Sequence, residues 1–377
     1  MPDVLVYADS IRSPELRHEV PVAVPDPFLY GEHAGTSHVL VHVMEAARMG
    51  GLGLELHPNE EYGYDELVAR GLHRYELLRE LCLRACRAWG IESAAVPATF
   101  PLELADFLRG GGVELTADRE LFAHRRRRKN EAELAGIRRA QRAAEAGMTA
   151  ARELLRSARP NGSGLVAGGE PLTSERLKLV LEQAFSQHEC SADEMVASHG
   201  AQTAIAHHMG EGAILPNEPI VIDVWPRDRQ TGCYADMTRT FVVGEPADDI
   251  RAWHALCVQA LEDAVAGTRA GVRDADLNRA TCELFAGHGH PTTLTKEPGT
   301  PLEDGFFHGL GHGVGLEVHE APILGVVGKD DLVAGDVITV EPGLYRKSYG
   351  GVRVEDLLLV TEDGAENLTR FPYDLEP

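Results

Sequence analysis

The sequence predicts an α+β protein of two domains, with the boundary after residue 122. Two observations support this prediction. The chain has 377 residues, which is long for one ordinary domain and suits two. Residues before the boundary mix short apolar segments with helical stretches. From about residue 190, by contrast, most segments are β-branched runs bounded by Gly, Pro, Asn or Asp, which is typical of strands and turns.

The expected first domain covers residues 1–122. The segments "DVLVYAD" (3–9) and "GGLGLELH" (50–57) read as strands. Residues 66–90 place apolar side chains at helical spacing and end at Gly90, a favourable helix terminus. We find no recognisable constellation of catalytic residues in this segment.

The expected second domain, residues 123–377, begins with a long amphipathic helix preceded by the basic run 125–129. In so acidic a chain we interpret this run as the solvated start of a helix, in preference to a nucleic-acid or localisation signal. Residues 159–171 are glycine-rich but lack the Lys-Ser/Thr ending of a phosphate loop, and we expect a surface loop. Helices are expected around 247–268 and 273–287, and strands within 217–225, 237–244, 335–343 and 353–363.

Composition excludes several classes of function. The formal net charge of −23 argues against a nucleic-acid or anionic-membrane partner, because either would need clustered cations. Six scattered cysteines without a CxxC pair indicate reduced thiols. The first residues lack the basic and apolar regions of a signal peptide, and no apolar run reaches the roughly 18 residues of a membrane helix. We therefore expect a cytoplasmic protein.

An internal repeat organises the carboxylates of the second domain. "ILPNEPIVID" (214–223) aligns with "LVAGDVITVE" (332–341), and the two segments end in Asp223 and Glu341. A second acid follows each, Asp236 after 13 residues and Glu355 after 14. Two such units related by a pseudo-twofold axis would direct four carboxylates to one centre. Their repulsion would be relieved by two divalent cations; the alternative is four ordinary surface acids.

Residues 308–320, "HGLGHGVGLEVHE", place His308, His312 and His319 in a glycine-rich segment just before the second carboxylate strand. A lone histidine is usually structural, but this clustering favours a site that binds metal and transfers protons. The chain has no HExxH motif, which argues against a single-zinc helix. Carboxylates with one imidazole favour Mn²⁺ or Co²⁺ over a thiolate-rich zinc site.

At this point the sequence resembles a known family. "VIDVWPRDRQTGCYADMTRTF", "HGLGHGVGLEVHE", "VEPGLY" and "GGVRVED" are similar to signature segments of the M24 metallopeptidases, which have the pita-bread fold. The two-domain length resembles the prolidase and Xaa-Pro aminopeptidase branch. The motifs span residues 200–357 and the fold resemblance spans 130–377. Residues 1–122 resemble, more loosely, a creatinase-type N-terminal α/β domain, which implies a homodimer.

The resemblance implies a dinuclear metal site of two divalent ions, Mn²⁺ in first place with Co²⁺ or Zn²⁺ as alternatives. The implied ligands are Asp223 on one metal, His312 and Glu341 on the other, and Asp236 and Glu355 bridging both. A hydroxide bridging the metals would then attack the Xaa-Pro bond of a dipeptide or short peptide.

The resemblance also implies roles for residues around the metals. Glu341 would carry a proton to the leaving nitrogen, while His319 and His207 would stabilise the developing charge and belong to the catalytic set. Substrate would contact His308, His319 and either His207 or His208, of which His207 is preferred because it begins an H-x-x-G-x-G run. Arg353 and Thr238 would steady a bridging carboxylate.

One departure from the family pattern concerns substrate choice. The turn between Asp223 and Asp236 is two residues longer than usual and carries Trp225 and Pro226. A bulky ring near the active-site mouth would make proline specificity less secure than hydrolysis itself. The alternatives are an M24-type peptidase without proline specificity and a non-catalytic pita-bread binding protein. A creatinase-like or methionine aminopeptidase activity is disfavoured by the complete ligand set and by the N-terminal domain, respectively.

Overall fold

The computed structural model describes residues 2–162 and 164–377. Within them the chain divides into two compact units, Met1–Arg126 and Arg127–Pro377. The division falls at Arg126/Arg127, compared with the predicted boundary after residue 122. The assignment of the first unit to the creatinase type stays a prediction.

The N-terminal unit is built on one mixed sheet in the order β4-β3-β2-β1-β5-β6. Its strands are β1 (Val4–Ala8), β2 (Phe28–His33), β3 (Thr36–Val41), β4 (Glu55–Pro58), β5 (Ser93–Val96) and β6 (Glu114–Ala117). The pairs β1/β2 and β2/β3 are antiparallel, whereas β3/β4, β1/β5 and β5/β6 are parallel. Its helices are α1 (Pro14–Glu19), α2 (Val43–Met49), the 3₁₀ turn η1 (Asn59–Tyr62), α3 (Tyr64–Ala69), α4 (Arg74–Trp89), α5 (Leu102–Gly110) and α6 (Arg119–Arg127), the last of which ends at the unit boundary.

Alternating side chains of this sheet face two different cores. Leu29 and Leu40 pack with residues of α4 and α5, whereas Val39 packs on the opposite face with residues of α1 and α6. The predicted helix over 66–90 is interrupted because Gly71 adopts φ +77°, and α4 begins only at Arg74. The helix ends at Gly90 as predicted. Of the predicted strand 50–57, only the last residues pair with the sheet.

The C-terminal unit opens with the long helix α7 (Glu131–Ser157), which the amphipathic pattern predicted. The other helices are α8 (Ser174–Gln187), the 3₁₀ turn η2 (Gly200–Ala204), α9 (Asp248–Gly267) and α10 (Asp274–Gly287), and the last two confirm the helices expected near 247–268 and 273–287. Where a surface loop was predicted over 159–171, the described residues contain a small sheet: β7 (Arg159–Asn161), β8 (Gly164–Ala167) and β9 (Glu170–Pro171).

Two larger sheets lie in the middle of this unit. The first has the order β11-β12-β14 and contains β11 (Met195–His199), β12 (Pro219–Val224) and β14 (Met237–Val242). The second has the order β16-β15-β17-β20-β21 and contains β15 (Gly311–Gly313), β16 (Glu320–Leu324), β17 (Val337–Val340), β20 (Asp356–Val360) and β21 (Ala365–Asn367). Two short pairs complete it, β10 (Cys190–Ser191) with β13 (Arg227–Asp228), and β18 (Gly343–Arg346) with β19 (Gly350–Arg353).

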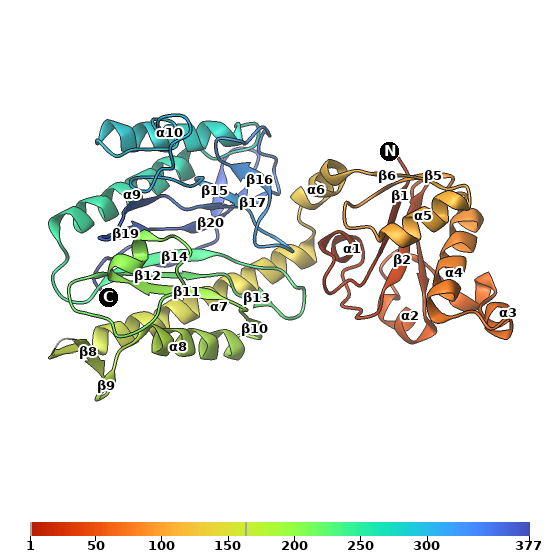
Figure 1. Ribbon diagram of the computed structural model, residues 1–377, viewed down its shortest axis with the longest axis horizontal. Helices are drawn as coiled ribbons and strands as arrows, with labels where there is room; N and C mark the ends of the chain where they lie inside the picture. The colour runs from red at the N-terminus through yellow and green to blue at the C-terminus, as the bar shows by residue number, and fades with distance from the viewer. Residues whose placement is uncertain (1, 163) are drawn as a thin grey trace. The chain divides into compact units, whose positions relative to one another are not determined.

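Each half of the C-terminal unit has its own hydrophobic core. In Figure 1 the strands lie between a helix pair α7/α8 on one side and α9/α10 on the other. Side chains of α7 and α8 pack with those of β12 and β14, whereas side chains of α9 and α10 pack with those of β17 and β20. This is the pseudo-twofold arrangement that the internal repeat predicted.

The basic run 125–129 is not a solvated helix start, and that prediction was wrong. Arg125 forms ion pairs of 2.6 Å with the carboxylates of both Glu19 and Glu32 within the N-terminal unit. In the C-terminal unit, Arg127 forms a bidentate ion pair with Asp336, and Lys129 forms an ion pair with Glu320 of β16. Both of these pairs are buried, so these cations hold elements together and do not form a binding surface.

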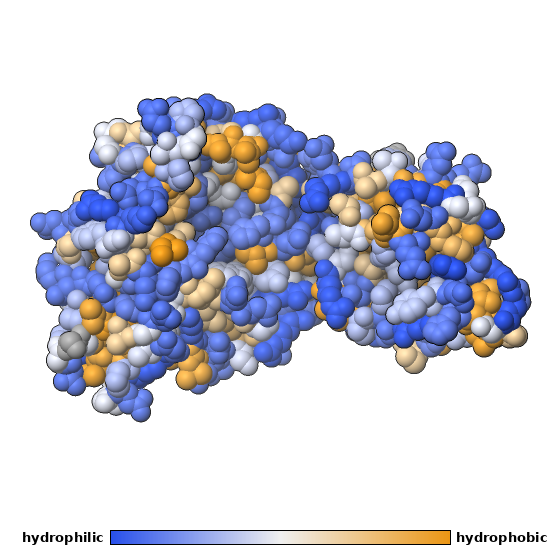
Figure 2. All heavy atoms as spheres, viewed as in Figure 1, coloured by the Kyte–Doolittle hydropathy of each residue, from blue (hydrophilic) through white to orange (hydrophobic). Residues whose placement is uncertain are grey.

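The face of the chain drawn in Figure 2 is hydrophilic over most of its area, with separate hydrophobic spots in each unit. Across residues 2–162 and 164–377, none of the helices combines the length and the apolar character that crossing a bilayer requires.

Candidate metal centre

Two antiparallel strand pairs position the carboxylates. In the first half, Asp223 lies near the end of β12, opposite Thr238 of β14, and Asp236 directly precedes β14. In the second half, Glu341 directly follows β17 and Glu355 directly precedes β20, the strand with which β17 pairs. The matched acids of the repeat therefore leave equivalent strand ends.

The glycines around His312 allow its strand to lie close to its neighbours. A Cβ at Gly311 would lie 2.1 Å from the carbonyl oxygen of Thr339, and a Cβ at Gly313 would lie 2.2 Å from that of Ala321. Both distances are far below van der Waals contact, so no other residue fits there without movement of the backbone. The glycine-rich sequence is thus explained by the tight packing that brings the imidazole to the carboxylates.

Four of the five predicted ligands, Asp236, His312, Glu341 and Glu355, converge. Ligand atoms of Asp236, His312 and Glu355 lie within 4.8 Å of one another. The Nε2 atom of His312 is 3.5 Å from Oε1 of Glu341 and 3.9 Å from Oδ2 of Asp236. Burial, followed by the charge of His319, lowers the pKa of His312 to about 3, so the ring is neutral. Its Nδ1 donates to the carbonyl of Gly313 at 3.2 Å, which leaves Nε2 as the nitrogen with a free lone pair.

The buried carboxyl groups of this cluster repel one another, and bound cations would relieve that repulsion. Burial first, and then the neighbouring carboxylates, raise the pKa values of Asp236 and Glu355 well above their ordinary range. Burial also raises the pKa of Glu341 to about 8. Among the described residues, Oδ1 of Asp223 and Oδ1 of Asp236 are buried without a hydrogen-bond partner. Bare carboxylate oxygens facing a neutral imidazole nitrogen are a donor set that fits divalent cations.

Arg353 and Thr238 contact these carboxylates. The hydroxyl of Thr238 donates to Oε2 of Glu355 at 2.6 Å. The guanidinium of Arg353 donates to Oδ2 of Asp223 at 2.6 Å and to the Thr238 hydroxyl at 3.3 Å. Arg353 therefore contacts Asp223 directly and reaches Glu355 through Thr238, which links carboxylates of the two halves.

Tyr345, which the sequence analysis did not name, joins this network. Its hydroxyl lies 2.9 Å from both Nη1 of Arg353 and Nε2 of His308. Burial, followed by the charge of Arg353, lowers the pKa of His308 to about 3, and its Nδ1 donates to the carbonyl of Gly309 at 2.7 Å. Tyr345 therefore accepts from the guanidinium and donates to the imidazole. The signal was its place in "VEPGLY", four residues after Glu341.

The remaining histidines differ in their surroundings. The ring of His319 lies 4.2 Å from that of His312, and its pKa is lowered by burial and then by the charge of His207. The charge of His207 also acts on His308. By contrast, Nδ1 of His208 accepts a hydrogen bond from the backbone N–H of Gly210. Of the two neighbouring histidines, His207 is thus the one whose charge acts on the cluster.

The longer turn after Asp223 is a structured element. Asp228 of β13 accepts hydrogen bonds from the guanidinium of Arg139 at 2.9 and 3.0 Å and from the hydroxyl of Thr231 at 2.6 Å. Trp225, at the start of this turn, is partly exposed, whereas Pro226 is buried.

Comparison with known proteins identifies the family of the chain. The model of metallopeptidase family M24 matches residues 135–362, which is more than half of the chain. The chain belongs to metallopeptidase family M24.

Among its relatives in this family is the Xaa-Pro dipeptidase of Pyrococcus furiosus, which is 34% identical over 184 residues, or 48% of this chain and 49% of the relative. The chain thus aligns with about half the length of this relative. The Xaa-Pro dipeptidase structure from Bacillus anthracis has a TM-score of 0.79 at 21% identity and covers 100% of this chain and 94% of its own.

The X-Pro aminopeptidase structure from Thermotoga maritima also has a TM-score of 0.79, at 19% identity, with 99% and 97% of the two chains covered. These matches confirm the predicted M24 family and the two-domain pita-bread fold.

Proposed function

We propose that this M24 protein is a dinuclear-metal exopeptidase that hydrolyses the Xaa-Pro bond of dipeptides or short peptides. The observation that carries the proposal is the convergence of buried acids with unpartnered oxygens on the free Nε2 of His312. The names of the relatives, which include both an Xaa-Pro dipeptidase and an X-Pro aminopeptidase, support a peptide substrate with proline after the scissile bond.

The metal ligands in this proposal are Asp223, Asp236, His312, Glu341 and Glu355. Two Mn²⁺ ions fit these oxygen-rich donors, with Co²⁺ or Zn²⁺ as alternatives. When bound, such ions supply Lewis acidity and lower the pKa of water toward neutrality. Five ligands of which four are carboxylates match the four positive charges of two divalent ions.

The protein's own groups handle protons and orient the substrate. Burial raises the pKa of Glu341 to about 8 in the metal-free protein, which favours the protonated carboxyl group there. We assign to it the delivery of a proton to the leaving nitrogen of proline. His319 is neutral and lies against His312, where it can donate a hydrogen bond to an oxygen that becomes negative. We also assign contacts with the substrate to His207 and His308.

The test is hydrolysis of matched peptides by the Mn²⁺-loaded protein. An Xaa-Pro dipeptide, an Xaa-Pro-Xaa tripeptide and a dipeptide without proline are compared at equal concentration. Cleavage of the dipeptide alone indicates a dipeptidase, and cleavage of the tripeptide as well indicates an aminopeptidase. Preference for the peptide without proline would overturn the specificity and would point to the turn that carries Trp225.

The control variant is Asp236→Asn, which keeps the size of the side chain but removes a charge from the predicted bridge. We expect it to lose metal and activity together. If no peptide is cleaved and the variant retains as much metal as the parent protein, the cluster is not a working centre. The non-catalytic binding protein then becomes the better description.

A further inference from the structure

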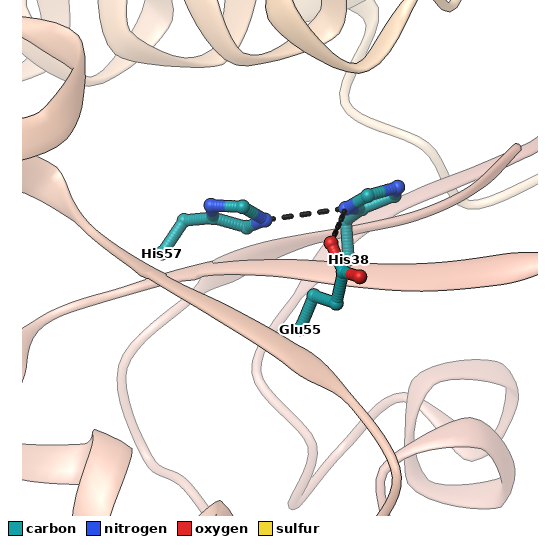
Figure 3. Close-up of side chains that lie close together, drawn as sticks. All are labelled: His38, Glu55 and His57. Atoms are coloured by element: carbon teal, nitrogen blue, oxygen red, sulfur yellow. Dashed lines mark hydrogen bonds and ion pairs between the residues drawn. The ribbon is translucent and has the colours of Figure 1, made fainter.

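A second group of metal-ligating side chains lies in the N-terminal unit, where the sequence analysis found no constellation. Strands β3 and β4 are parallel neighbours, and His38 is the register partner of Glu55. Because side chains alternate along a strand, Glu55 and His57 project from the same face of β4. Figure 3 shows the side chains of His38, Glu55 and His57 directed toward one another.

Two of the three spacings between the ligand atoms fit a tetrahedral metal ion, and all three ligand atoms lie within 4.8 Å of one another. The remaining spacing, between His57 and Glu55, would close by rotation of the exposed Glu55 side chain. The Nδ1 atom of His38 lies 3.2 Å from Nε2 of His57 and 3.3 Å from Oε2 of Glu55. Metal–ligand bonds of about 2.0 Å at the tetrahedral angle place neighbouring ligand atoms about 3.3 Å apart. The 3.2 Å contact between the two imidazoles is also at the long end of the range for a hydrogen bond, so the distance fits either a hydrogen bond or a pair of metal ligands.

The tautomer of His57 supports the same interpretation. Its Nδ1 lies 2.9 Å from Oε2 of Glu61, a carboxylate that can only accept. Nδ1 therefore carries the proton, and Nε2 presents its lone pair to the centre of the group. A histidine that donates its second N–H to a carboxylate is the usual arrangement around a protein-bound metal.

Neighbouring side chains orient the ring of His38 and leave one side of the group open. Its ring stacks on the indole of Trp89 from α4, with ring centroids 5.2 Å apart and 14° between the planes. Burial lowers its pKa, which keeps the imidazole in the neutral form that binds metals. The side chain of Glu55 is 60% exposed, so the group opens to solvent on one side.

We propose that His38, Glu55 and His57 form a mononuclear site for a divalent transition-metal ion, with Zn²⁺ as the best fit, separate from the M24 centre. Two imidazoles and one carboxylate are a common zinc donor set, and a solvent molecule would complete four-coordination. The ion would join the edge strand β4 to β3. The proposal is independent of the peptidase function, because none of its residues belongs to that site.

The test measures zinc in the full-length protein after equilibration with about 10 µM free Zn²⁺, a concentration at which specific protein sites are filled. To remove zinc held by the M24 centre, Asp236→Asn and His312→Ala are introduced as a common background. We expect one zinc equivalent in this background and at least about tenfold weaker binding after His57→Gln or Glu55→Gln. The exposed side chain of Glu55 makes its variant safe for folding.

The matched control is Glu60→Gln, which removes the same charge five residues after Glu55 in the sequence and should leave zinc binding unchanged. In crystals of the parent protein, anomalous scattering at the zinc edge should give a peak between His38, Glu55 and His57. Equal zinc binding in the background and in both test variants would overturn the proposal, as would an empty position in the anomalous map. Peptide hydrolysis by His57→Gln in the otherwise unchanged protein should match that of the parent.

Discussion

Thr238 offers a sharp test of how the protein would control metal affinity at the proposed M24 centre. Its hydroxyl donates to Oε2 of Glu355 at 2.6 Å and accepts from Arg353, and the residue is fully buried. Thr238→Val removes the hydroxyl while keeping a side chain of the same shape. The Glu355 carboxylate then loses the donor that fixes its rotamer and holds its charge.

The size of the effect follows from the contact. A short hydrogen bond from a neutral hydroxyl to a buried carboxylate contributes about 1.5–3 kcal/mol. Since about 1.4 kcal/mol corresponds to a tenfold change in affinity, we expect Mn²⁺ affinity to fall about 10–100-fold. Isothermal titration of the metal-free protein with Mn²⁺ measures this change directly.

Thr240 provides the matched control on the same strand. It is equally buried, but its hydroxyl donates to the backbone carbonyl of Arg353 at 2.9 Å and accepts from the Arg353 N–H at 3.0 Å. Thr240→Val should lower the free energy of unfolding by about 1–3 kcal/mol, because two backbone groups lose their partner. It should leave Mn²⁺ affinity within about threefold. Equal losses of affinity in the two variants would refute the reasoning, because the effect would then reflect general loosening of the strand.

Three further outcomes are expected. Tyr345→Phe removes the donor to His308 and should lower kcat about tenfold or more while metal content stays unchanged; a matching loss of metal would contradict the assignment. Arg127→Met leaves the buried carboxylate of Asp336 without its partner and should cost about 3–5 kcal/mol in denaturant unfolding; a loss under about 1 kcal/mol would mean that water replaces the guanidinium. Burial raises the pKa of Glu341 to about 8, so at pH 7 the metal-free carboxyl group still holds its proton. Mn²⁺ affinity should therefore rise with pH up to about 8, and metal binding should release a proton. An affinity that does not change with pH would contradict the role of Glu341 as a metal ligand.

Local patterns predicted much of the fold. The helices α7, α9 and α10 and the strands that flank the metal centre follow from periodicity and turn residues, both of which are short-range properties. The internal repeat brought Asp223 and Glu341 into correspondence before any geometry was known. The structure places these acids at equivalent strand ends because both copies of the repeat fold as antiparallel pairs.

The failures at Arg127, Tyr345 and His57 share a physical cause, which is pairing between residues far apart in sequence. Arg127 looked solvated because its partner, Asp336, lies 209 residues away. Tyr345 went unnoticed because a tyrosine signals nothing until the groups on either side of its hydroxyl are known. The group around His57 needed the register of β3 on β4, which a sequence without an alignment does not reveal.

The close backbone packing at Gly311 and Gly313 is required for folding, whereas the acids of the proposed centre are required only for its chemistry. The two kinds of position should therefore tolerate substitution differently during evolution. Neither position has room for a Cβ, so replacement would be selected against in any descendant that still has to fold. Substitution of Asp236 should instead be favoured in a protein that no longer binds the ion, because burying an uncompensated carboxylate lowers the stability of the fold. A lineage that abandons hydrolysis should therefore keep its glycines and discard its acids. In a library of this gene selected only for folded protein, substitutions should accumulate at position 236 and remain absent from positions 311 and 313.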